Sequence, residues 1–151
     1  MKVIPSSATV LLFAVTSAAA AGNGMIAVES PHSPEATMNR FESIVEEQGL
    51  NVFARINHTE GADSIDMELR PTELLIFGNP QGGTPFMQCA QTVGIDLPLK
   101  ALVWEDGDGK VWLGYNDPTW IATRHFAGNC PPVKNISEAL EKMSAAAVAQ
   151  E

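Results

Sequence analysis

Residues 99–116 read LKALVWEDGDGKVWLGYN, two apolar stretches joined by two Asp-Gly pairs. Asp-Gly between apolar runs is the strongest short-range signal for a β-hairpin, because both residues tolerate the backbone angles of a tight turn. We therefore expect antiparallel strands over residues 99–105 and 110–116, with Asp106 and Asp108 in the turn. The same two aspartates resemble the start of a calcium loop, but Lys110 stands where that loop needs another oxygen ligand.

Strand patterns also precede the hairpin. Residues 25–30 predict a short strand. Residues 50–57 alternate, which predicts a half-buried strand with one apolar side. That apolar side consists of Leu50, Val52, Ala54 and Ile56. Residues 74–77 are apolar without alternation, which predicts a central strand covered on both faces.

Three helix starts carry the same signature, a capping side chain followed by a proline whose missing N–H is not needed there. These starts are Ser33-Pro34, Thr84-Pro85 and Asp117-Pro118. On the second helix Phe86, Cys89 and Val93 recur at helical spacing, so Cys89 is expected to face the core.

A last helix is expected over about residues 136–148, after a stiff extended link at Cys130-Pro131-Pro132. Strands separated by helices, together with a clear hairpin, indicate the α+β class. The sequence thus predicts a single compact domain, in which a mostly antiparallel sheet is covered by helices.

The first 21 residues have the order of a secretory signal peptide. Lys2 supplies the positive start, residues 10–15 are apolar, and residues 18–21 are small, so we expect cleavage after Ala21. Polar residues and a proline interrupt the apolar run, whereas a spanning helix needs about 20 apolar residues. The expected product is a periplasmic or secreted domain over residues 22–151, without stable membrane insertion after cleavage.

The net negative charge of the chain limits the classes of molecule that it is expected to bind. The chain has a formal net charge of −9, and such an excess of carboxylates repels phosphate backbones, so nucleic acid is not an expected partner. Cys89 and Cys130 form an even pair, which predicts a disulfide in an oxidising compartment. The alternative is a soft-metal set for copper or haem, although its spacing matches no standard motif. That set consists of Met87, Cys89, His125 and Cys130.

The middle of the chain resembles the bacterial domain-of-unknown-function family 302. The motifs that carry the resemblance lie at residues 55–58, 69–80, 83–85, 94–100, 104–106 and 114–118. Together they span about residues 35–126, and the helix after Pro132 lies outside them. The resemblance implies a compact α+β fold like that of TATA-binding protein, and it implies no activity.

The candidate ligand site is a glycine-containing loop over residues 78–85, expected between a strand and the N-terminus of a helix. Free N–H groups and the helix dipole at such a place favour a small anion. The alternative is a turn that needs glycine only for its backbone angles. The site residues are expected to be His58, Asn79, Gly82, Gly83 and Thr84.

These features favour a periplasmic binding or sensing module for a small ligand, with a homodimer as a further expectation. A copper- or haem-associated protein is the first alternative. The second is an enzyme that uses His58 as a general base, since histidine titrates near neutral pH. No nucleophile can be paired with His58 from the sequence, so no catalytic residue is assigned.

Overall fold

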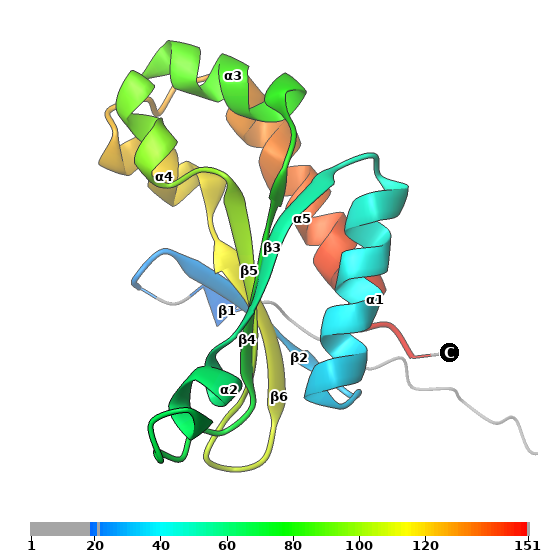
Figure 1. Cartoon of the computed structure of the whole chain (residues 1–151). Coiled ribbons are helices and arrows are strands. Elements are labelled where there is room, and N and C mark those ends of the chain that lie inside the picture. Colours follow the sequence, from blue (N-terminus) through cyan, green and yellow to red (C-terminus); the bar gives the residue numbers. More distant parts are fainter. Residues whose placement is uncertain (1–18, 21, 151) are drawn as a thin grey trace, which may run out of the picture.

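The structure is a computed structural model that describes residues 19–20 and 22–150, and it shows an antiparallel sheet packed against helices (Figure 1). The strands are β1 Ala19–Ala20, β2 Met25–Ser30, β3 Asn51–Asn57, β4 Thr72–Gly78, β5 Leu99–Glu105 and β6 Val111–Asn116. The helices are α1 Pro34–Glu47, α2 His58–Asp63, α3 Pro80–Cys89, the 3-10 helix η1 Gln91–Ile95, α4 Pro118–Arg124 and α5 Pro132–Ala147. The predicted α+β class is confirmed.

The sheet has the strand order β1-β2-β6-β5-β4-β3, and all neighbouring strands are antiparallel. The expected hairpin forms its centre as β5 and β6. Trp104 lies opposite Trp112 across this hairpin, and their rings stack with centroids 6.4 Å apart. Cross-strand aromatic pairs of this kind stabilise a sheet and help to hold its register.

The hairpin turn is organised by the Asp106 carboxylate. Oδ1 accepts hydrogen bonds from the backbone N–H groups of Asp108 and Lys110, at 2.9 and 3.0 Å. Oδ2 accepts a 2.7 Å hydrogen bond from the indole N–H of Trp112. These bonds, the one from Trp112 first, lower the pKa of Asp106 below its ordinary value of 3.8.

The Asp106 network predicts a pH dependence of stability. Because its pKa is lower in the folded chain than in the unfolded chain, Asp106 contributes stability above about pH 4. That contribution is lost as the pH falls from about 4 through the folded-state pKa. We expect Asp106→Asn to show a smaller loss of unfolding free energy between pH 5 and pH 2 than the wild type, in urea titrations followed by circular dichroism. Asp108→Asn is the control, because Asp108 joins the network through its backbone N–H. Equal losses of unfolding free energy in the wild type and in Asp106→Asn would contradict the role given to the Asp106 carboxylate.

Helices α1 and α5 lie on the same side of the sheet (Figure 1). The core that they bury includes Phe41 and Phe77, whose rings meet edge to face with centroids 5.4 Å apart. The other members of this core are Val28, Met38, Val45, Leu75, Ala101, Val103, Val111, Leu113, Tyr115, Leu140, Met143, Ala147 and Val148. A second, smaller core joins α3, η1 and α4 to the first turns of α5.

A β-bulge in β3 overturns the predicted alternation. The register shifts between Val52 and Ala54, so that Val52 lies opposite Phe77 while Ala54 lies opposite Ile76. The extra residue moves the rest of the strand to the other side of the sheet. Val52 therefore packs on the helix-covered core, whereas Ala54 and Ile56 lie on the opposite face, and the expectation of one shared apolar side was wrong.

The prediction that β4 is covered on both faces was also wrong. Leu75 and Phe77 are fully buried under the helices, but Leu74 and Ile76 remain partly exposed on the other face. The strand is apolar on both sides although helices α1 and α5 cover only one of them (Figure 1).

Helix α3 begins at Pro80, five residues earlier than the predicted start at Pro85. Asn79 is its N-cap and accepts a hydrogen bond from the Gly82 N–H at 2.8 Å, and Pro85 lies inside the helix. Because the helix ends at Cys89, the helical spacing toward Val93 is broken, and Cys89 is exposed rather than directed into the core.

The link before the last helix is not extended. Pro131 has helical backbone angles, and α5 begins at Pro132 instead of near Ile136. Proline at the first helical position loses no hydrogen bond, so the two prolines start the helix instead of delaying it.

Most of the predicted signal peptide, residues 1–18 and 21, lies outside the described residues. Within the predicted leader, β1 pairs Ala19 with Ala27 and Ala20 with Ile26 at the edge of the sheet. Cleavage after Ala21 would therefore leave the five strands β2-β6-β5-β4-β3. Among the described residues, no helix has the length and apolar character needed to cross a bilayer.

Candidate functional site

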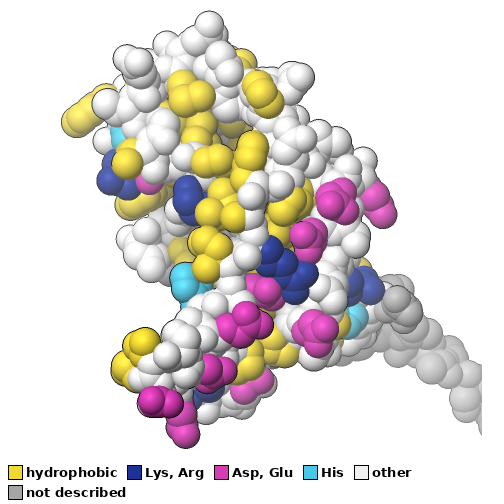
Figure 2. Space-filling view, in the orientation of Figure 1, with side chains coloured by type: hydrophobic (Ala, Val, Ile, Leu, Met, Phe, Trp, Pro, Cys, Tyr) yellow, Lys and Arg dark blue, Asp and Glu magenta, His cyan; other side chains and the backbone are white. Residues whose placement is uncertain are grey.

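A cavity of about 520 Å³ lies where α3, the segment before β5 and α5 meet the ends of β3 and β4. In the space-filling view, hydrophobic side chains gather on this face in the region below α3 (Figure 2). Its apolar walls are formed by Leu50, Phe53, Pro80, Met87, Leu97, Pro98, Leu99, Ile136, Ala139, Leu140 and Met143. The size is that of a site for a small organic molecule.

The walls of the cavity contain few polar side chains. Asn79, Thr84 and Asn135 are the polar side chains among its described lining residues, and none of the lining residues is charged. Two methionines, Met87 and Met143, contribute flexible thioethers that adapt to a ligand and pack well against aromatic rings. The walls therefore suit an uncharged, largely apolar molecule.

The bulge in β3 shapes the entrance to the cavity. Phe53 is the residue at the register shift, it lines the cavity, and 57% of its surface is exposed. Bulges are common next to binding sites because they redirect a single side chain. Here the extra residue places an aromatic ring beside the opening instead of in the sheet.

Four of the five predicted ligand residues, Asn79, Gly82, Gly83 and Thr84, line this cavity. They do not form the expected anion cradle. The Gly82 N–H donates to Asn79 Oδ1, and the Gly83 N–H donates to the Asn79 carbonyl at 3.1 Å. Helix α3 uses these two donors for its own cap, so they are not available to a ligand.

Of the glycines that line the cavity, Gly94 is the one at which an added side chain would crowd an apolar wall residue. A Cβ at Gly83 would lie 3.6 Å from Leu97 Cδ1, and a Cβ at Gly94 would lie 3.3 Å from Met87 Sδ. The distance at Gly83 is an ordinary van der Waals contact, whereas a side chain at Gly94 would press on the Met87 thioether.

His58, the fifth predicted ligand residue, does not reach the cavity. It is an exposed residue at the first position of α2, next to the end of β3 that pairs with Glu73. The cavity lies at the other end of this strand, where Asn51 pairs with Gly78. Six residues of strand separate the two places by about 20 Å.

Cys89 and Cys130 are joined by a disulfide with a Cα–Cα distance of 5.9 Å. The bond connects the last residue of α3 to the segment just before α5. Both cysteine sulfurs of the alternative metal set are therefore in the disulfide and are not thiolates, which leaves Met87 and His125 from that set. The described residues contain no cluster of three or more histidine, cysteine, aspartate or glutamate side chains suited to a metal ion.

His125, from the same alternative set, belongs to a polar network that the sequence analysis missed. Its Nε2 lies 2.6 Å from Asp96 Oδ2, and its Nδ1 lies 2.9 Å from Thr92 Oγ1. Arg124 donates to Asp96 Oδ1 at 2.8 Å. The network joins η1 and its following loop to α4, and it holds the wall that Gly94 and Leu97 contribute to the cavity. Because 29 residues separate Asp96 from His125, no local pattern indicates the contact.

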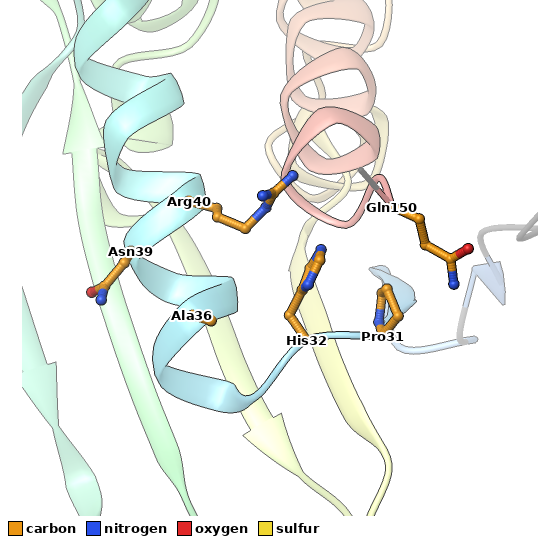
Figure 3. A pocket seen from close by; sticks show the side chains of 6 residues that line it. All are labelled: Pro31, His32, Ala36, Asn39, Arg40 and Gln150. Carbon is orange, nitrogen blue, oxygen red and sulfur yellow. The ribbon is translucent and has the colours of Figure 1, made fainter.

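A second hollow lies between α1 and the C-terminal end of α5, lined by Pro31, His32, Ala36, Asn39, Arg40 and Gln150 (Figure 3). Arg40 and His32 both point toward the last turn of α5. Arg40 donates to the carbonyls of Ala147 and Ala149 at 2.8 and 3.1 Å, and His32 Nε2 lies 2.9 Å from the Ala149 carbonyl. A cation at these carbonyls caps the negative end of the helix dipole. The polar groups here stabilise α5, so we do not assign a ligand to this hollow.

A third hollow, beside α1 and β3, is polar and contains Arg55. Arg55 donates to Glu73 with two nitrogens, at 2.7 and 2.9 Å, and to Glu42 at 2.7 Å. The hydrogen bond to Glu73 is the main cause that raises the pKa of the guanidinium above its ordinary value. Since these carboxylates already occupy its donors, the site is an ion-pair network that ties β3 to α1 and β4.

The fold and the cavity define a class of small α+β domain, in which an antiparallel sheet covered by helices carries an apolar cavity at one end. The chain belongs to the family described as "Domain of unknown function DUF302", which matches residues 26–150. This match is longer than the stretch expected from the sequence, residues 35–126, and it includes α5. A crystal structure of an uncharacterized conserved protein DUF302 from Bacillus stearothermophilus is similar, with a TM-score of 0.67 and 25% sequence identity over 83% of this chain and 95% of that one.

Curated relatives come from Brucella. Proteins named "Fluoride-specific ion channel FluC 1" from Brucella suis and Brucella abortus are each 52% identical over 106 residues, which is 70% of this chain. The shared stretch makes up 42% of the first protein and 39% of the second. The chain therefore spans about two fifths of these relatives.

Proposed function

We propose that the protein is a binding module for a small, uncharged and largely apolar molecule, which it holds in the cavity between α3 and α5. The observation that carries the proposal is the pairing of a ligand-sized cavity with walls that contain no charged residue among the described positions. Pockets for small organic molecules have this character, with a few polar groups that orient the ligand. Asn135 and Thr84 are suited to that orienting role, because their side chains carry donors and acceptors.

The way in which the walls are held supports the proposal. The disulfide fixes the end of α3 next to the start of α5, and the network of Asp96 and His125 fixes the segment between η1 and β5. A site whose walls are already fixed loses less conformational entropy when a ligand binds. The remaining freedom lies in Phe53 at the opening and in the methionine side chains.

An anion is less suitable as a ligand than the glycine-containing loop over residues 78–85 suggested. The two glycine N–H groups at the start of α3 are used by its cap, and the chain has a net charge of −9, which repels negative ligands. The same argument applies to fluoride, the ion in the names of the Brucella relatives. We therefore do not extend the activity in those names to this chain.

A neutral fluorescent probe tests the cavity directly. N-phenyl-1-naphthylamine is apolar and uncharged, and its emission rises in a dry environment. We expect it to bind the wild type saturably, and we expect Ala139→Phe to weaken binding at least about tenfold, or about 1.4 kcal/mol. Ala139 lies on an exposed part of α5 and lines the cavity, so the added ring fills the space without replacing a core residue.

The matched control is Ala145→Phe, which adds the same ring at an exposed position of α5 that is not a lining residue. This variant should bind the probe within about twofold of the wild type, and circular dichroism should show that both variants are folded. The anionic probe 1-anilinonaphthalene-8-sulfonate should bind more weakly than the neutral one. Equal binding of the neutral probe by wild type and Ala139→Phe would overturn the proposal.

The predicted signal peptide would direct the protein to the periplasm or out of the cell, and the ligand would be bound there. An extracytoplasmic module that captures an apolar compound would serve as a carrier or as a sensor. Both roles require reversible binding, so the probe should be displaced by organic extracts that contain the natural ligand.

A further inference from the structure

The cavity between α3 and α5 lies where the two hydrophobic cores of the domain meet. Met143 on α5 belongs to the larger core, and Met87 on α3 packs against the smaller one. Ile136 packs against both cores, and all three side chains line the cavity. One thioether therefore reaches the cavity from each core, and a ligand that fills the space contacts both of them.

The sulfur of Met87 has a defined place on the cavity wall. A Cβ at Gly94 would lie 3.3 Å from Met87 Sδ, so the sulfur lies against the backbone of η1. Gly94 and Met87 are both lining residues of the cavity. Because glycine has no side chain, the sulfur is not separated from the space by another wall residue at this position.

Phe53 supplies the one aromatic ring among the described lining residues of the cavity. It lies at the bulge of β3 beside the opening, and it is 57% exposed. An apolar ligand that enters the cavity covers part of this ring. Aromatic rings favour contact with other rings in offset or edge-to-face arrangements, so the opening favours a ligand that has a ring of its own.

The other apolar walls do not distinguish between kinds of apolar ligand. Leucine, isoleucine and proline side chains accept a saturated ring as readily as an aromatic one, because the hydrophobic effect has no preferred direction. The side chains that discriminate are Met87, Met143 and Phe53. Each sulfur–aromatic or ring–ring contact changes the affinity for an aromatic group by roughly twofold to tenfold.

We propose that the ligand of this cavity is an aromatic compound, whose ring is held by the thioethers of Met87 and Met143 and by the ring of Phe53. The inference rests on the proposed function, since it names the class of molecule that the same cavity takes. Asn135 and Thr84 are suited to bind a polar substituent on such a ring. The expected ligand is therefore an uncharged aromatic molecule instead of a saturated one of similar size.

Two bicyclic hydrocarbons, naphthalene and decalin, test this preference because they differ in aromaticity at the same number of carbon atoms. Their affinities are measured by displacement of N-phenyl-1-naphthylamine, whose own affinity is first titrated for each protein. We expect Phe53→Leu and Met87→Leu each to weaken naphthalene binding about fivefold and to leave decalin binding within about twofold. The comparison of variant with wild type removes the difference in hydrophobicity between the two compounds.

Met143→Leu extends the test to the larger core. Met143 is only 4% exposed, but the exchange of methionine for leucine conserves volume and is well tolerated in protein interiors. The three changes together should lower the ratio of naphthalene affinity to decalin affinity at least about twentyfold. Circular dichroism shows whether this variant folds, and Phe53→Leu, at an exposed side chain, keeps the test decisive if it does not.

The matched controls make the same changes outside the cavity. Phe126→Leu and Met67→Leu alter side chains that are 99% and 60% exposed and are not lining residues. Both variants should bind the two hydrocarbons as the wild type does. Equal losses for naphthalene and decalin in the cavity variants, or a failure of naphthalene to displace the bound probe, would overturn the inference and leave the cavity as a binding site. A wild type that binds neither the probe nor the hydrocarbons would overturn the proposed function, and this inference with it.

Discussion

Replacement of both cysteines, Cys89→Ala with Cys130→Ala, should lower the free energy of unfolding by about 4 kcal/mol. The disulfide closes a loop with a sequence separation of 41 residues, and in the chain-entropy model its loss gives the unfolded chain about this much additional freedom. For a domain of this size the midpoint of thermal unfolding should fall by about 10–20 °C. The measurement is guanidinium unfolding followed by circular dichroism under oxidising conditions.

Reductant supplies the control for this prediction. The reduced wild type should unfold at the same denaturant concentration as the double variant, and reductant should leave the double variant unchanged. Because the bond holds one end of α3 against α5, the double variant should also bind the neutral probe more weakly. If the oxidised wild type and the double variant unfold together, the pair is not a stabilising bond in solution.

Signals contained within a few residues predicted the local structure well. The turn at Asp106 and Gly107 determines which strands pair, and the caps at Ser33 and Asp117 accept hydrogen bonds from the N–H groups of Ala36 and Thr119. Each of these signals needs only neighbouring residues to form. They were sufficient for the element types and the antiparallel sheet, and the similarity to solved structures agrees with that fold.

Failures of the prediction come from competition between equivalent local signals. Asn79-Pro80 and Thr84-Pro85 both have the form of a helix start, and Gly82-Gly83 between them favoured a loop. The structure begins the helix at the first pair, where the asparagine side chain caps Gly82 and the second proline is accommodated inside the helix. Both signals are present in the sequence, and the Asn79 cap with its hydrogen bond from Gly82 is visible only in the structure.

The contacts between segments that are distant in the chain could not be predicted from the sequence. An apolar strand such as residues 74–77 looks the same whether its second face meets helices, a ligand or another molecule. The cavity was found only in part, because Asn79 to Thr84 lie in one segment while Met143 and Phe53 come from distant elements. The bulge that places Phe53 there has no local signature in a strand without glycine.

Phe41→Ala should remove about 4 kcal/mol from the free energy of unfolding, within the range of about 3–5 kcal/mol for a buried phenylalanine. Phe41 is completely buried on α1, and its ring meets Phe77 edge to face. The loss combines the buried apolar area with the cavity left under the helix. Phe126→Ala is the matched control, because Phe126 is 99% exposed, and its change should stay within about 0.5 kcal/mol. A loss below about 1 kcal/mol for Phe41→Ala would mean that α1 does not pack on the sheet as described.

The combination of the two largest changes tests whether the molecule unfolds as one unit. Phe41 belongs to the core between the sheet and α1, whereas Cys130 belongs to the core of α3, η1 and α4. Helix α5 contributes to both, and Ile136 packs against each of them. If α5 couples the two cores, both changes lower one cooperative transition, and their sum of about 8 kcal/mol leaves the triple variant largely unfolded. If the core of α3 and α4 opens by itself, the loss of the disulfide abolishes probe binding while the sheet keeps its own transition, and hydrogen exchange at α3 and at β5 distinguishes the two outcomes.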